Sequence, residues 1–272
     1  RKREILFRGG VGARKLFVAT FAVLATILFI GPLFGVVYHS FSAGGSFTVS
    51  WYVRIFSTGY EALIGAAPLG AIQNSLSFAL GAALLSAVIG IPLAYTLARG
   101  EVKGGKVFDA LAMLPLGVSS VALGFAFLEV FIYGPFSLLP RSAIIIIVHA
   151  ILAYPFFIRT LVPALRSLKR ELIESAELAG GNRWDVFWRV ELPIIRGPLL
   201  AGLAFVFAIS MGEMSATIML IRPGVKTIPV AIYELIGARE FGSASALSVL
   251  LMVIVGFVFF LIDRVGGGFW EG

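Results

Sequence analysis

The chain has 272 residues, of which 59% are hydrophobic and only 14% are charged, and its mean hydropathy is +0.97. Soluble proteins of this length carry about 25% charged residues, so this composition excludes an ordinary soluble fold and indicates a chain embedded in lipid. The net charge of +7 at first leaves nucleic acid or anionic lipid open as partners, whereas the absence of cysteine excludes disulfides and thiolate metal sites.

Six apolar runs are long enough to cross about 30 Å of hydrocarbon, which takes about 20 helical residues. We therefore predict spans at 16–38, 72–97, 107–132, 142–163, 194–220 and 243–263. The third, fourth and fifth contain Pro and polar residues, namely Pro115, His149, Pro155 and Glu213. Pro is tolerated in a spanning helix where neighbouring helices satisfy the freed carbonyl groups.

Two longer connections, 39–71 and 164–193, separate these spans. The first contains Trp51, Tyr52, Ile55 and Phe56 before a stretch rich in Gly and Pro. Aromatic residues are enriched at membrane–water interfaces. We expect an interfacial segment followed by a loop there, and we find no soluble domain and no internal repeat.

The distribution of the cations predicts the orientation, because cytoplasmic loops carry an excess of Lys and Arg. With six spans, 17 of the 22 Lys and Arg residues fall on one side. This side holds both termini of the segment and the 164–193 loop, which we expect in the cytoplasm of a multi-pass protein of the plasma (inner) membrane. The basic composition then needs no nucleic acid. The start, Arg1-Lys2-Arg3 without Met, indicates a piece of a longer or processed chain.

The 164–193 loop predicts a helical hairpin. Leu165, Leu168, Leu172, Ala176 and Ala179 have the spacing of one helix face in a helix over 164–179. The pair Gly180-Gly181 would end this helix, since Gly tolerates the left-handed conformation after a helix.

The second arm of this hairpin is predicted from its capping residues. Asn182 would cap a second, short helix, and Asp185 would favour its positive N-terminal end. Trp184, Phe187 and Trp188 would project from it, and Pro193 would begin the next span. From these residues alone, a hairpin lying on lipid headgroups and a docking element for another protein are both open.

The spacing in this loop resembles the EAA loop of ABC importer permeases. The match consists of Glu174-Ser-Ala176, then Gly180, then Val190-x-Leu192-Pro193, and it departs from the family pattern in having Ser175 in place of the first Ala. The resemblance implies a MetI-like permease fold, all-α, with six transmembrane helices and a cytoplasmic coupling helix hairpin. It implies one permease domain over 1–272, with a core at 72–263 and the coupling loop at 164–193.

The same resemblance implies a transport subunit without catalytic residues, cofactor or metal site. Its partners would be a dimer of ABC ATPase subunits, a second permease half (fused or separate), an extracytoplasmic solute-binding protein and membrane lipid. The residues expected to couple to the ATPase are Glu174, Ser175, Ala176, Gly180, Asn182, Trp184, Phe187, Val190, Leu192 and Pro193.

Two further stretches resemble permeases. Gln73-Asn74-Ser75-Leu76 looks like the usual start of the permease core, and 212–234 is similar to permeases of the ferric iron and thiamine group. Similar residues occur at this place in molybdate and tungstate permeases. We therefore expect ferric iron or a thiamine-like solute, with an oxyanion as the alternative. A basic start without Met suits the C-terminal half of a fused two-half permease.

Glu213 is a carboxylate inside a predicted span, and such groups normally face a partner or an aqueous path. It would either bond to neighbouring helices near the outer end or act in the translocation path with Ser210, Ser215 and Thr217. His149 is likewise open between a packed, hydrogen-bonded residue and a pathway residue.

Three other functions fit the sequence less well. The run Gly100–Val107 nearly matches a phosphate-binding loop but has Val107 where the Mg²⁺-binding hydroxyl belongs. An ion-gradient secondary transporter would have several intramembrane carboxylates and inverted repeats. This sequence has one good intramembrane carboxylate, Glu213, and no repeat. An intramembrane enzyme would have a paired nucleophile and base or clustered metal ligands, which His149 does not supply.

Overall fold

The computed structural model describes residues 12–57, 60, 65, 67–99, 105–134, 139–222 and 224–266. The expectations that concern Arg1–Arg3, the Gly100–Gly104 part of the glycine-rich turn and Pro223 lie outside these residues. The described residues are mostly helical. They include one β-hairpin, whose strands β1 (Ser42–Ala43) and β2 (Ser46–Phe47) have two residues each. The predicted all-α fold is confirmed.

Five helical runs in the described part of the chain are long and apolar enough to cross a membrane. They are α1 (Ala13–Ser40), α4 (Pro68–Arg99), α7 (Arg141–Ser167), the continuous run Arg183–Gly212 and α13 (Phe241–Gly266). The shorter elements are α2 (Ser50–Ile55), α5 (Gly105–Met113), η1 (Leu114–Gly117), α6 (Ser120–Leu128), η2 (Glu129–Tyr133), α8 (Arg170–Leu178), α11 (Ser215–Leu220) and α12 (Ile228–Gly237). The run Arg183–Gly212 consists of α9 (Arg183–Val186), η3 (Phe187–Glu191) and α10 (Leu192–Gly212).

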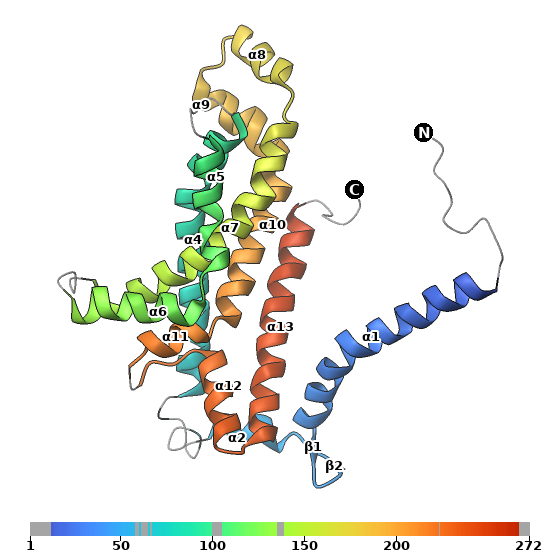
Figure 1. Ribbon diagram of the computed structural model, residues 1–272. Helices are drawn as coiled ribbons and strands as arrows, with labels where there is room; N and C mark the ends of the chain where they lie inside the picture. The colour runs from blue at the N-terminus through green and yellow to red at the C-terminus, as the bar shows by residue number, and fades with distance from the viewer. Residues whose placement is uncertain are drawn as a thin grey trace.

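Helices α4, α7 and α10 pack side by side and form the centre of the bundle (Figure 1). Phe157 of α7 is fully buried between glycines of the other two helices. A Cβ at Gly90 of α4 would lie 2.6 Å from its ring, and one at Gly202 of α10 would lie 2.8 Å from it. Small residues allow helices to approach closely in lipid, where packing replaces the hydrophobic drive. This contact fixes the spacing of the three helices.

The α8–α9 hairpin and the β-hairpin lie at opposite ends of the bundle, as Figure 1 shows. The connection 39–71 contains α2 next to the β-hairpin, and Trp51 of α2 packs on Gly242 of α13. Helix α1 lies at the edge of the bundle against α13, and its most apolar window has no buried residue. The described chain buries none of the side chains in this window, whereas Ser40 at the end of α1 is fully buried.

The third predicted span, 107–132, is wrong as a single straight helix. The helical segments Asp109–Gly117 and Ser120–Tyr133 meet at 96°. Pro115 and Gly117 lie in the short 3₁₀ segment before the bend, and Val118 and Ser119 are extended with ψ of 136° and 130°. Extended backbone cannot continue a helix, so α6 lies across the bundle (Figure 1). The count of six spans holds only if this bent pair crosses as one.

The fifth predicted span, 194–220, is also interrupted. Helix α10 ends at Gly212, Glu213 has a ψ of 118°, and α11 starts at Ser215. The Glu213 carboxylate accepts a hydrogen bond from the backbone N–H of Ala216 at 2.7 Å. A side chain that binds the first turn of the next helix competes with continuation of the first helix. The apolar spacing of this span does not show such a bond.

Candidate functional site

The end of the bundle formed by α8, α9 and η3 holds the predicted coupling residues. One helix over 164–179 was expected, but α7 ends at Ser167 and α8 starts at Arg170. Leu168 and Lys169 between them are extended, with ψ of 120° and 126°. The first arm of the hairpin is therefore a separate helix, joined to α7 through two non-helical residues.

The turn between the arms has the predicted glycine chemistry. Gly180 has a φ of +91°, so it needs the freedom of a residue without a side chain. Its N–H donates to the Glu177 carbonyl at 3.0 Å, and that of Gly181 donates to the Ala176 carbonyl at 3.1 Å. These two bonds form a Schellman motif, which satisfies the last carbonyl groups of α8.

The predicted cap of the second arm is confirmed. The Asn182 Oδ1 accepts hydrogen bonds from the backbone N–H groups of Trp184 and Asp185, each at 2.9 Å. The Asp185 carboxylate accepts in return from the Asn182 N–H at 3.4 Å, completing a capping box. The short segment from Ala176 to Asp185 is thus held in one shape by its own backbone and capping bonds.

The hairpin exposes large apolar side chains. Leu178 is 90% exposed and Trp184 is 69% exposed, while the rings of Phe187 and Trp188 pack on Trp184 at centroid distances of 6.1 and 5.6 Å. Exposed apolar groups of this size at a surface mark sites of contact with proteins or membranes. The hairpin therefore presents an exposed apolar surface that lies beyond the ends of α4 and α7 (Figure 1).

The remaining predicted coupling residues fall into two groups. Glu174 is exposed and paired with Arg170 at 2.9 Å, and the Ser175 hydroxyl donates to the Glu171 carbonyl at 2.6 Å. Ala176, Val190 and Leu192 are half-buried, and Pro193 is exposed. Pro193 lies in the first turn of α10, as expected, although the helical run already begins at Arg183. Pro is accommodated there since it falls at the start of α10, after the π-helical turn η3.

Glu191 is a site residue that sequence reasoning missed. It occupies the unassigned position between Val190 and Leu192, it is 4% exposed, and it binds two residues of α4. The Tyr95 hydroxyl donates to its Oε2 at 2.8 Å, and the Arg99 guanidinium donates to its Oε1 at 3.0 Å. The sequence did contain a signal for this site, because Glu191 stands at the edge of an apolar run. A carboxylate that is buried there needs a charged or hydrogen-bonding partner.

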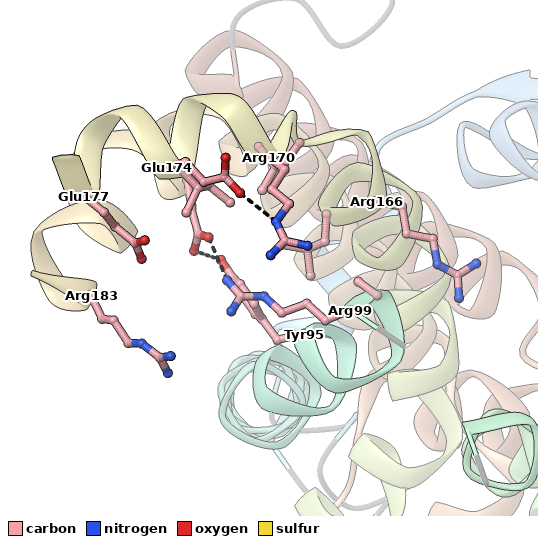
Figure 2. A pocket seen from close by; sticks show the side chains of 12 residues that line it. Tyr95, Arg99, Arg166, Arg170, Glu174, Glu177 and Arg183 are labelled. Atoms are coloured by element: carbon pink, nitrogen blue, oxygen red, sulfur yellow. Dashed lines mark hydrogen bonds and ion pairs between the residues drawn. The ribbon is translucent and has the colours of Figure 1, made fainter. Parts of the chain in front are cut away.

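A cavity of about 450 Å³ lies between the hairpin and the ends of α4 and α7 (Figure 2). Its labelled side chains in Figure 2 come from both sides of the cavity, with Tyr95 and Arg99 facing the hairpin. Arg166, which also lines it, donates to the Leu97 carbonyl at 3.1 Å. The hairpin is therefore attached to the end of α4 around a polar space.

The predicted translocation residues lie around the break after α10. Ser210 and Thr217 are 4% and 0% exposed, and Glu213 and Ser215 are half-buried. His149 of α7 joins the two sides of the break, because its Nδ1 lies 2.7 Å from the Ser210 hydroxyl and its Nε2 lies 2.7 Å from the Thr217 hydroxyl. The hydrogen-bonded alternative for His149 is thus the one that the structure shows.

The directions of these bonds follow from Thr217. Its hydroxyl donates its single proton to the Glu213 carbonyl at 3.1 Å, so it accepts from Nε2–H of His149. In the neutral imidazole, Nδ1 then accepts from the Ser210 hydroxyl. A continuous chain of hydrogen bonds connects α10, α7 and α11 at the break.

Replacing His149 with leucine is expected to destabilise the bundle by about 1–2 kcal/mol, the upper range for interhelical hydrogen bonds in membranes. The loss leaves the buried Ser210 hydroxyl without its partner. Thermal unfolding of the detergent-purified protein measures the change. The triple variant that adds Ser210→Ala and Thr217→Val should recover stability, and an equally unstable triple variant would contradict the assigned chain.

Among the described residues, no group of three or more His, Asp or Glu side chains lies in a position to hold a metal ion.

Comparison with known proteins agrees with this geometry. Residues 86–266 match the family described as binding-protein-dependent transport system inner membrane components. A permease protein of Salmonella typhimurium named for 2-aminoethylphosphonate transport is 27% identical, over 94% of this chain and 93% of that protein. A permease protein of Haloferax volcanii named for molybdenum transport is 31% identical over 75% and 77%. A ferric transport system permease of Actinobacillus pleuropneumoniae is 26% identical, over 89% of this chain but 35% of that longer protein.

Solved structures share the fold. A chain of a bacterial alginate ABC transporter, solved with an alginate-bound periplasmic protein, has a TM-score of 0.67 at 20% identity, covering 94% of this chain and 97% of that one. A chain of a methionine ABC transporter in an inward-facing conformation has a TM-score of 0.60 at 18% identity, covering 77% and 97%. The matched family covers most of the helical bundle and the whole hairpin, and the chain belongs to the inner-membrane permease components of binding-protein-dependent ABC importers.

Proposed function

We propose that this chain is one membrane half of an ABC importer, driven by ATP that a separate ATPase subunit hydrolyses. The observation that carries the proposal is the hairpin, which is held in one shape by a Schellman turn and a capping box yet exposes Leu178 and Trp184. A preformed element with unpaired apolar groups suits docking into a groove on another protein. The hairpin end of the bundle is then cytoplasmic, as the Lys and Arg distribution predicts.

The other parts of the importer follow from the same proposal. A second permease half, fused or separate, would complete the path, and a solute-binding protein would deliver the solute at the end that carries α2 and the β-hairpin. Glu213 and Ser215, which are half-buried at the break in the described chain, are the proposed path residues. Ser210 and Thr217 would act through them, because their hydroxyls are engaged with His149.

The solute is proposed from the relatives. Ferric iron was the first expectation, with a thiamine-like solute beside it, and the relative named for ferric transport supports iron. The relatives named for 2-aminoethylphosphonate, molybdenum and sulfate transport support the oxyanion alternative. We propose a small oxyanion as the first candidate. Uptake of labelled molybdate, sulfate, 2-aminoethylphosphonate and ferric iron by the complete transporter tests it, and uptake of iron alone would contradict it.

Replacing Leu178 with glutamate is expected to reduce copurification of the ATPase subunit about tenfold, because a charge would enter an apolar groove, at a cost of more than about 1.4 kcal/mol. Leu178 is 90% exposed, so the fold itself should not change. The matched control is Val49→Glu, an exposed apolar residue at the opposite end. Full ATPase recovery with the Leu178 variant, or equal loss with both variants, would refute docking through this hairpin.

A further inference from the structure

The buried carboxylate of Glu191 joins the hairpin to α4. Glu191 is the last residue of η3, and its two oxygens bind two side chains one turn apart on α4, Tyr95 and Arg99. The Arg99 guanidinium also lies 5.5 Å from the centre of the Tyr95 ring, within cation–π range. The three groups therefore hold one another in a fixed arrangement.

The second arm of the hairpin is continuous with α10. Residues Arg183–Gly212 form one helical run that includes the π-helical turn η3, so a displacement of the hairpin tip acts first on this run. At Glu191 the run is bonded to the last two turns of α4. Phe187, one turn earlier, adds a ring contact with Tyr95 at 6.2 Å.

Helix α7, to which the first arm is joined, has its own bond to the end of α4. Arg166, at the end of α7, donates to the Leu97 carbonyl on α4 at 3.1 Å. The junction at Leu168 and Lys169 is extended, so it lets α8 turn relative to α7. Both bonds have a guanidinium donor, but the Glu191 carboxylate is buried and accepts from two side chains, so the joint at Glu191 is the stronger of the two.

We propose that Glu191 is a positioning residue that transmits movement of the docked hairpin to α4, through Tyr95 and Arg99. The proposal rests on the proposed function, since it assumes an ATPase that moves the hairpin. Without the carboxylate, the hairpin would still dock, but its displacement would not be passed to α4. ATP hydrolysis and transport would then become uncoupled.

The test measures two rates on the complete, reconstituted transporter with its ATPase and solute-binding protein. With Glu191→Gln, we expect the ATPase to copurify and to hydrolyse ATP near the original rate. Solute uptake should fall about tenfold, as expected when a buried charge-assisted bond is lost, so the ATP hydrolysed per solute rises by the same factor. A parallel fall in both rates, or no change in their ratio, would overturn the proposal.

Two further variants keep the test decisive. If Glu191→Gln does not assemble, Tyr95→Phe removes only one hydroxyl from the joint, and it should still raise the ATP-to-solute ratio. Exchange of the charges in Glu191→Arg with Arg99→Glu should restore part of the uptake. An unchanged ratio with Tyr95→Phe, or an exchange that rescues nothing, would count against transmission through this joint.

The matched control is Thr96→Val, which removes the hydroxyl next to Tyr95 that bonds only within α4, to the Pro92 carbonyl at 2.9 Å. It removes one hydrogen bond beside the joint without touching Glu191 and should leave the ATP-to-solute ratio unchanged. A failure of the proposed function has a different signature, because the unaltered protein would then bind no ATPase at all.

Discussion

Gly180→Val is expected to lower solute uptake by the complete transporter about tenfold, with the membrane helices intact. At a φ of +91° a β-branched residue is strained, by about 1–2 kcal/mol or more, and about 1.4 kcal/mol corresponds to a tenfold change in the population of the native turn. Without that turn, α8 would lose its fixed position relative to α9. Uptake into proteoliposomes and copurification of the ATPase measure the loss.

Gly224 supplies the control for this experiment. It has a similar φ of +84°, nothing lies within 4 Å of the place that a Cβ would occupy, and it precedes α12, in the opposite half of the molecule. Gly224→Val introduces the same strain but should leave copurification of the ATPase unchanged. If both valine variants lose the ATPase equally, the effect comes from general instability, and the hairpin has no special part in docking.

The second large effect is expected at Gly124, where α6 meets α11. A Cβ at this position would lie 2.8 Å from the backbone of Ala216, and backbone cannot rotate away as a side chain can. Gly124→Leu should therefore cost at least the roughly 1–3 kcal/mol typical of overpacking. Because α11 follows the break at Glu213, the displaced helix would also disturb the proposed path.

Thermal unfolding and solute uptake are the two measurements for Gly124→Leu. Gly117→Leu is the comparison. Gly117 ends η1, just before the bend that leads into α6, and nothing lies within 4 Å of the position that its Cβ would take. We expect a lower melting temperature and lower uptake for the Gly124 variant alone. A Gly124 variant as stable as the Gly117 variant would show that α6 and α11 separate freely.

The hairpin was the most predictable part of this molecule, because its determinants are local. The left-handed Gly180 and the capping box of Asn182 with Asp185 depend on residues that are near one another in sequence, and both predictions are confirmed. The exposure of Trp184 follows from the same local geometry. The helix boundary at Leu168 was missed, since its apolar side chain continued the spacing of a helix face.

The breaks in the third and fifth spans were less predictable, because hydropathy measures the solvent of a segment and not its direction. Val118 is as apolar in extended backbone as in a helix. The partners of His149 and Glu191 are 61–68 and 92–96 residues away, so only the packing of α4, α7 and α10 could bring them together. A single sequence shows that such polar groups need partners without showing which ones.

The continuous run Arg183–Gly212 has a mechanical consequence. At about 1.5 Å per residue, its 30 residues measure about 45 Å, so about 15 Å stands beyond a hydrocarbon layer of about 30 Å. Counted from Arg183, this protruding part reaches Glu191 after about 12 Å. Movement of a docked hairpin would therefore meet the joint with Tyr95 and Arg99 before it reached the hydrocarbon layer.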